Sequence, residues 1–185
     1  MGLVAWVAGV VFMLDQMLKY LVVQVMDLAR VQQIDVIPPY LNLRMAWNQG
    51  VNFGLFASGH DTMRWVLMGI AAVICVWVWI WVWRSNAGVL ARIAAGLLIG
   101  GALGNVVDRA IYGAVADFLN MSLPGWRNPY SFNVADIAIF AGAIGLVFMP
   151  QKPPAPVKTP RKPRAKPAPK SPAVDKPRDD SENPG

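Results

Sequence analysis

Four long apolar stretches alternate along the chain with segments that carry most of its polar residues. The clearest stretch, from Trp65 to Val82, has no charged side chain and is long enough to cross a hydrocarbon core of about 30 Å as a helix. The pattern predicts membrane-spanning helices at approximately residues 3–25, 64–83, 89–108 and 132–149. The predicted fold class is therefore an all-α membrane protein, with a four-transmembrane-helix bundle over residues 1–150.

The composition agrees with insertion in a membrane. Of the 185 residues, 55% are hydrophobic and only 15% are charged, which is more apolar surface than a soluble domain of this size buries in one core. The first stretch resembles a secretory signal peptide in part, but it lacks a basic leader and a small-x-small cleavage pattern before Asp15. We expect it to remain as the first span.

The distribution of charge predicts the orientation of the spans. Four spans place both termini on one side, together with the short connection that carries Arg84 and Arg92. That side holds eleven of the seventeen Lys and Arg residues, so the positive-inside rule makes it cytoplasmic. Residues 151–185 are rich in Pro and Lys without apolar periodicity, which predicts a disordered basic cytoplasmic tail. Weak attraction of this tail to anionic lipid headgroups or to nucleic acid is an alternative to a purely solvated role.

The two connections on the outer side differ in length. In the long connection, residues 40–47 follow two prolines and partly alternate apolar and polar side chains. This pattern predicts a small β-hairpin or β-sheet on the outer face. The second outer connection contains Pro124 and Gly125 and is expected to be a flexible loop.

The polar residues within or beside the predicted spans converge on the outer side. They come from the first, third and fourth spans and the segment after the third: Asp15, Lys19, Asn105, Asp108, Arg109, Asp117, Asn133 and Asp136. Ionisable side chains at membrane depth are costly, so their clustering indicates a functional site.

The residue types present favour chemistry by carboxylates. The serines lie outside the four spans or at their edges, the single histidine, His60, has no ligand partners at a metal-type spacing, and Cys75 is the single cysteine. Asp117 and Asp136 flank a segment that leaves the membrane and returns, so its ends can meet. Two adjacent carboxyls do not ionise together readily, so one can donate a proton while the other deprotonates water. Peptide hydrolysis without a covalent intermediate would follow.

Structural roles are alternatives for each of these residues. Asp136 could cap the fourth helix, and Asp117 could pair with Arg109. Asp15 and Lys19 are four residues apart with the acid first, the favourable order for an ion pair within a helix.

Two functions of other classes also fit part of the pattern. Embedded Asp and Lys residues also mark ion pathways, so a proton-coupled small membrane transporter is the main alternative. The glycines of the third span could serve an assembly protein or close packing within one bundle. A transport path should also place ionisable groups in the inner half of the membrane, where the second and fourth spans have none.

Four motifs resemble the signature blocks of bacterial lipoprotein signal peptidases, the signal peptidase II family. In chain order these are DQMLK at 15–19, NQGVNFG at 48–54, GGALGNVVDR at 100–109 and FNVAD at 132–136. Their order and spacing, and the four-span layout, resemble that family from about residue 3 to residue 149.

The resemblance implies an aspartic endopeptidase of the bacterial inner membrane, with its active site at the periplasmic face. It would remove the signal peptide from diacylglyceryl-modified prolipoproteins by cutting before the lipidated cysteine. Asp117 and Asp136 would be the catalytic dyad. Residues that match family positions for substrate binding or support of the dyad are Asp15, Lys19, Asn48, Gly50, Phe53, Gly101, Asn105, Arg109, Asn133 and Ala135. We expect no metal, no cofactor and no nucleic acid, with prolipoproteins and membrane lipids as partners of a monomer.

Overall fold

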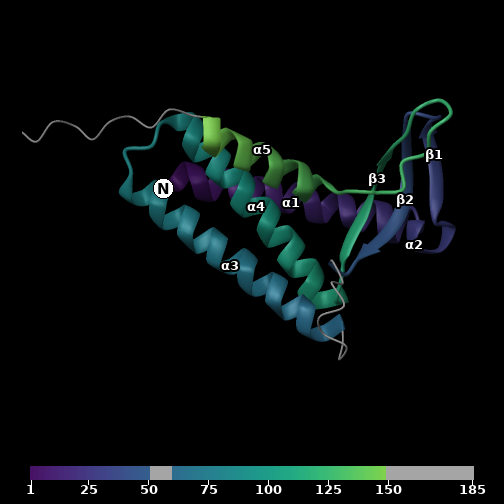
Figure 1. Cartoon of the computed structure of the whole chain (residues 1–185), viewed down its shortest axis with the longest axis horizontal. Coiled ribbons are helices and arrows are strands. Elements are labelled where there is room, and N and C mark those ends of the chain that lie inside the picture. The colour runs from purple at the N-terminus through teal and green to yellow at the C-terminus, as the bar shows by residue number, and fades with distance from the viewer. Residues whose placement is uncertain (51–59, 149–185) are drawn as a thin grey trace, which may run out of the picture. The chain divides into compact units, whose positions relative to one another are not determined.

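The structure, a computed structural model, describes residues 1–50 and 60–148 (Figure 1). Its helices are α1 (Gly2–Lys19), α2 (Leu28–Val31), α3 (His60–Arg84), α4 (Val89–Tyr112) and α5 (Val134–Phe148), and a π-helical segment, η1 (Tyr20–Val25), continues α1. Its strands are β1 (Gln33–Ile37), β2 (Leu41–Asn48) and β3 (Val115–Met121). Phe53 and the predicted tail at 151–185 lie outside the described residues.

Within residues 1–50 and 60–148, three helical segments are long and apolar enough to cross a membrane: Gly2–Val25, Thr62–Arg84 and Val89–Tyr112. They correspond to the first three predicted spans. The fourth predicted span corresponds to α5, which is apolar and comprises 15 residues. The fold is thus mostly helical, as the apolar pattern predicts.

α4 is the central helix of the described bundle and contacts α1, α3 and α5. In its apolar window 61% of residues are buried against protein, compared with 11% in α3. Small side chains permit this packing: a Cβ on Gly100 would lie 2.5 Å from the Ala8 carbonyl oxygen of α1. A Cβ on Gly142 of α5 would lie 2.5 Å from the Ala94 carbonyl oxygen. Helices without bulky side chains at their contacts can bring their backbones together, which is how membrane helices commonly associate.

The strands form one antiparallel sheet in the order β1-β2-β3, and Figure 1 shows them together near the C-terminal end of α1. The pairing of β1 with β2 confirms the small sheet predicted around residues 40–47. One apolar cluster anchors the sheet to η1 and α2, with Val22, Val23, Leu28, Leu43 and Phe118 among its buried members.

β3 is an element that the sequence pattern did not reveal. It pairs with β2, so that Ala46 lies opposite Asp117 and Asn42 opposite Asn120. Its first four residues are all buried, so it lacks the alternation of apolar and polar side chains that identifies a half-exposed strand.

One predicted boundary was wrong. α4 continues to Tyr112 rather than ending near residue 108, so Asn105 and Arg109 both lie within the helix. Gly113 ends the helix with φ of 79°, a conformation that glycine adopts without steric cost, and its N–H donates to the Arg109 carbonyl. The loop at Pro124 has a defined turn, closed by reciprocal backbone hydrogen bonds between Leu123 and Trp126 of 3.0 and 2.9 Å.

Packing at Gly142 predicts a stability difference between two glycine substitutions. Gly142→Ala should lower the free energy of unfolding by about 1–3 kcal/mol, because its methyl group would overlap the α4 backbone. Gly69→Ala in α3 is the matched control, since a Cβ there meets no atom within 4 Å. Unfolding of both variants in detergent tests the prediction, and equal stabilities would contradict the close contact of α4 and α5.

Candidate active site

The two aspartates of the candidate dyad lie on different elements that the chain brings together. Asp117 is on β3, and Asp136 is in the first turn of α5. The segment before α5 pairs with β3: the Phe118 and Leu119 N–H groups donate to the Phe132 carbonyl at 3.1 and 2.8 Å. The Phe132 N–H donates back to the Leu119 carbonyl at 3.0 Å. This pairing places the start of α5 beside β3.

Asparagine side chains connect the two carboxyls. Asn133 Nδ2 donates to Asp117 Oδ1 at 2.6 Å and to Asn105 Oδ1 at 3.2 Å. Asn105 Nδ2 donates in turn to Asp136 Oδ1 at 2.9 Å. On its other side, Asp117 Oδ2 accepts a hydrogen bond of 3.0 Å from Asn48 Nδ2. Amides therefore bridge the pair and fix the direction in which each carboxyl faces.

Asp136 also takes part in capping α5. Its backbone N–H donates to Asn133 Oδ1 at 2.8 Å, and its Oδ2 accepts from the Asn133 N–H at 3.3 Å. This reciprocal arrangement is a capping box, and it places a carboxylate at the positive end of the helix dipole. The capping role considered from the sequence is thus present in the geometry, while Oδ1 of Asp136 is held by Asn105.

Lys19 lies at the centre of a buried group of charges beneath the dyad. Its Nζ is 2.7 Å from Asp15 Oδ2 and 2.8 Å from Asp108 Oδ2, and it donates to Asn105 Oδ1 at 3.2 Å. The predicted Asp15–Lys19 pair is therefore present, but Lys19 also neutralises a second carboxylate. Asp15, Lys19 and Asp108 are 0%, 5% and 1% exposed, so none of these charges could be stable here without its partners.

Each carboxylate paired with Lys19 holds the backbone directly before one dyad aspartate. Asp15 Oδ1 accepts the Ala135 N–H at 2.9 Å, and Ala135 precedes Asp136. Asp108 Oδ2 accepts the Ala116 N–H at 3.1 Å, and Ala116 precedes Asp117. One lysine thus supports the backbone positions of both aspartates.

Glycines of α4 leave space for this group. A Cβ on Gly104 would lie 2.5 Å from Asp15 Oδ2, and a Cβ on Gly101 would overlap the Ala135 carbonyl oxygen. Gly50, with φ of 94°, donates its N–H to Asn48 Oδ1 at 2.9 Å and so helps to orient the side chain that contacts Asp117.

Burial changes the protonation of the dyad. Burial, and secondly the charge of Asp136, raise the pKa of Asp117 from the ordinary 3.8 to about 6, while hydrogen bonds from Asn48 and Asn133 act in the opposite direction. Asp117 therefore retains its proton at a pH where an exposed carboxyl has lost it. Two coupled carboxyls that hold one proton can act together as an acid and a base.

Arg109 does not form an ion pair with the candidate aspartates within the described residues. Arg109 Nη1 donates to the Asn105 carbonyl of its own helix at 3.4 Å. Among the described residues, ion pairs join Lys19 to Asp15 and Asp108 and Arg30 to Asp27, so the alternative pair of Asp117 with Arg109 is not formed there. Residues 1–50 and 60–148 contain no group of three or more His, Cys, Asp or Glu side chains placed to hold a metal ion.

The sequence placed Asp108 in the polar cluster without assigning it a role, and it did not single out Gln16. Asp108 holds the backbone before Asp117, and Gln16 Nε2 donates to Asp108 Oδ1 at 3.0 Å and to Asp15 Oδ2 at 3.3 Å. The helical spacing gave a signal for Asp108, because it is three residues after Asn105 and therefore on the same face of α4. Gln16 gave no comparable signal.

Comparisons with known proteins identify the family of the chain. Residues 7–150 match the family described as signal peptidase (SPase) II. The lipoprotein signal peptidase of Methylobacterium sp. (strain 4-46) is 39% identical over 140 residues, which cover 76% of this chain and 83% of that protein. The lipoprotein signal peptidase of Methylobacterium radiotolerans is 40% identical over 132 residues, which cover 71% of this chain and 73% of that protein.

Solved structures share the fold. A bacterial membrane enzyme determined by the in meso method at 1.9 Å resolution is similar with a TM-score of 0.65 and 28% identity, covering 80% of this chain and 91% of that chain. A second, at 2.3 Å resolution, has a TM-score of 0.59 and 29% identity and covers 80% of this chain and 86% of that chain. The family match covers most of the chain, and the two relatives are 39% and 40% identical over more than two thirds of it. The chain therefore belongs to the signal peptidase II family.

Proposed function

We propose that Asp117 and Asp136 are the catalytic dyad with which this chain removes signal peptides from prolipoproteins. Membership of the signal peptidase II family makes the chain a protease of that kind. The main support for this assignment is the series of hydrogen bonds through the Asn133 and Asn105 side chains, which links the two carboxyls. Such a link can hold two side chains from separate elements in one geometry.

The two carboxyls have different parts in the proposed reaction. Asp117 carries the proton, because its pKa is raised to about 6 by burial first and by Asp136 second. Asp136 takes a proton from a water molecule, whose oxygen attacks the scissile carbonyl, while Asp117 donates its proton to the carbonyl oxygen. The tetrahedral intermediate then breaks its C–N bond as the leaving nitrogen receives the proton held by Asp136, and one hydroxyl of the intermediate returns its proton to Asp117 as the product carboxyl forms. No covalent bond to the enzyme is formed.

The remaining candidate residues act by positioning. Asp15, Lys19 and Asp108 fix the backbone before each aspartate, and Asn48 restrains Asp117 from the other side. Gly50, Gly101 and Ala135 allow the close contacts that this arrangement requires. Phe53, which lies outside the described residues, and Arg109 are proposed to contact the substrate.

A membrane location suits a substrate that carries acyl chains. In the proposed arrangement all four spans cross the inner membrane, both termini are cytoplasmic and the dyad is at the periplasmic face. Eleven of seventeen basic residues on the cytoplasmic side support this orientation. The diacylglyceryl group can then remain in the bilayer while the bond before the lipidated cysteine reaches the dyad from the side. Residues 1–150 would form the peptidase as a monomer, with 151–185 as a cytoplasmic tail.

The transporter alternative has no support from the comparisons, in which the relatives are lipoprotein signal peptidases. Among the described residues, the buried charges of Asp15, Lys19 and Asp108 form one group, which suits a reaction site better than a path across the membrane.

Neutral amides in place of the aspartates test the assignment. Asp117→Asn and Asp136→Asn should each lower cleavage of a diacylglyceryl-modified prolipoprotein by at least about 10³-fold, since asparagine can hydrogen bond but cannot transfer the proton. The control is Asp27→Asn, which removes a carboxylate near the exposed turn after η1. Full activity in either dyad variant, or equal loss in the control, would contradict the assignment.

Removal of Lys19 tests the support beneath the dyad. Lys19→Met should lower the free energy of unfolding by about 3–5 kcal/mol, because two buried carboxylates lose their counter-charge. Arg30→Met removes the cation of an exposed ion pair and should have little effect on stability. Chemical unfolding in detergent compares the two variants, and a similar small loss in both would show that Lys19 does not hold this group together.

A further inference from the structure

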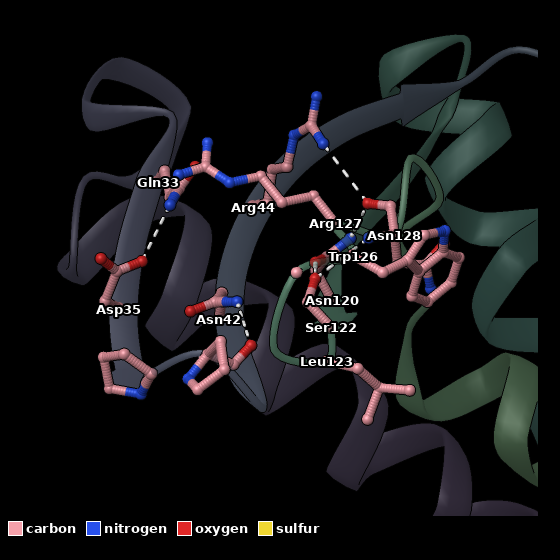
Figure 2. A pocket seen from close by; sticks show the side chains of 13 residues that line it. Gln33, Asp35, Asn42, Arg44, Asn120, Ser122, Leu123, Trp126, Arg127 and Asn128 are labelled. Carbon is pink, nitrogen blue, oxygen red and sulfur yellow. Dashed lines mark hydrogen bonds between the residues drawn. The ribbon is translucent and has the colours of Figure 1, made fainter.

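A second polar feature lies on the sheet, apart from the candidate dyad. A cavity of about 660 Å³ opens between the β1-β2 hairpin and the loop that follows β3 (Figure 2). Its volume is within the range of small-molecule binding sites. None of the residues that connect Asp117 and Asp136 lines it. Asn120, in its wall, is three residues beyond Asp117 on β3, which corresponds to about 10 Å along a strand.

Two arginine side chains of the cavity are not neutralised by ion pairs within the described residues. Arg44 and Arg127 line it, and neither forms an ion pair among the described residues. Arg44 Nη1 has one long contact, 3.5 Å to the Asn128 carbonyl. The carboxylate of Asp35 also lines the cavity and accepts a hydrogen bond of 2.8 Å from Gln33 Nε2. Two guanidinium groups with free N–H donors match the oxygens of a phosphate group.

The wall that carries Arg127 is held in place by buried polar side chains. Asn120 Nδ2 donates to the Asn128 and Tyr130 carbonyls at 2.9 and 2.8 Å. Ser122 Oγ donates to Asn120 Oδ1 at 3.0 Å and accepts the Asn128 N–H at 3.1 Å. Because the loop is already held in one conformation, a ligand that binds in the cavity needs to order it little, and the entropic cost of ligand binding is lower.

Apolar side chains beside the arginines indicate the kind of molecule that carries the phosphate. Leu123 and Trp126 line the cavity and are 57% and 53% exposed. Tyr40 and Tyr130 are also exposed. Their backbone carbonyls accept hydrogen bonds from the Ser122 N–H and from Asn120 Nδ2, respectively. Exposed aromatic residues next to basic ones are typical of segments at the surface of a bilayer. A water-soluble phosphate would gain little from these apolar groups.

We propose that this cavity binds the phosphate of an anionic phospholipid headgroup between Arg44 and Arg127, with Trp126 and Leu123 beside the glycerol and the start of the acyl chains. The bound lipid would hold the sheet against the membrane surface at the C-terminal end of β3, about 10 Å along the strand from Asp117. Lipid binding here is a property separate from the cleavage reaction and does not depend on the dyad.

Binding of short-chain lipids to the full-length protein in detergent tests the proposal. Native mass spectrometry would compare dioctanoylphosphatidylglycerol with dioctanoylphosphatidylcholine, and the anionic lipid should bind more tightly. Arg44→Gln combined with Arg127→Gln should weaken binding of the anionic lipid by about tenfold or more, the loss expected for charge-assisted hydrogen bonds. Asp35→Asn should strengthen it, because this change removes a like charge from the cavity.

The matched control is Arg84→Gln combined with Arg92→Gln, which removes the same charge at the connection between α3 and α4. This control should bind the anionic lipid like the wild type. Equal losses in the two double variants, no loss in the Arg44 and Arg127 variant, or equal binding of the two lipids would overturn the proposal. Soluble glycerophosphoglycerol that binds as tightly as the lipid would overturn the assignment of the ligand to a membrane.

Discussion

The placement of the two candidate catalytic aspartates depends on the neutralisation of two buried carboxylates by Lys19. Asp15 and Asp108 bind the N–H groups that precede Asp136 and Asp117, so charge pairing in α1 and α4 determines where β3 and α5 begin relative to each other. A buried ion group of this kind contributes little net stability compared with apolar packing. Here the ion group acts mainly by positioning, because Lys19 and its two carboxylates connect α1, α4, α5 and the start of β3.

The helices could be predicted from the sequence because length and hydropathy are local properties. The predicted spans at 3–25 and 64–83 correspond to α1 with η1 and to α3. β3 could not be predicted, because its pairing partner β2 is distant in sequence and both of its faces are buried at Asp117. Contacts between residues distant in sequence also limited the prediction of the site. The resemblance identified Asn105 and Asn133. The contact between Gln16 and Asp108 could not be predicted, because it requires the packing of α1 on α4.

The described part of the chain therefore has two polar regions with different environments. The network around Asp117 and Asp136 is enclosed between α1, α4, α5 and β3, where burial raises the pKa of Asp117 to about 6. The cavity of Arg44 and Arg127 is open and is lined by the exposed Trp126 of the loop that follows β3. The first region suits chemistry from which bulk water is largely excluded, and the second suits contact with the membrane surface.

The proposed reaction requires that the network of amides and carboxylates hold Asp117 and Asp136 close enough to share one proton. Infrared spectroscopy of the purified protein can follow the carbonyl stretch of a protonated carboxyl during a pH titration. We expect a band that disappears as the pH rises through about 6, because burial first and Asp136 second raise the pKa of Asp117 to that value. This band should be missing in Asp117→Asn. Ionisation of all aspartates together near the ordinary value of 3.8 would contradict it.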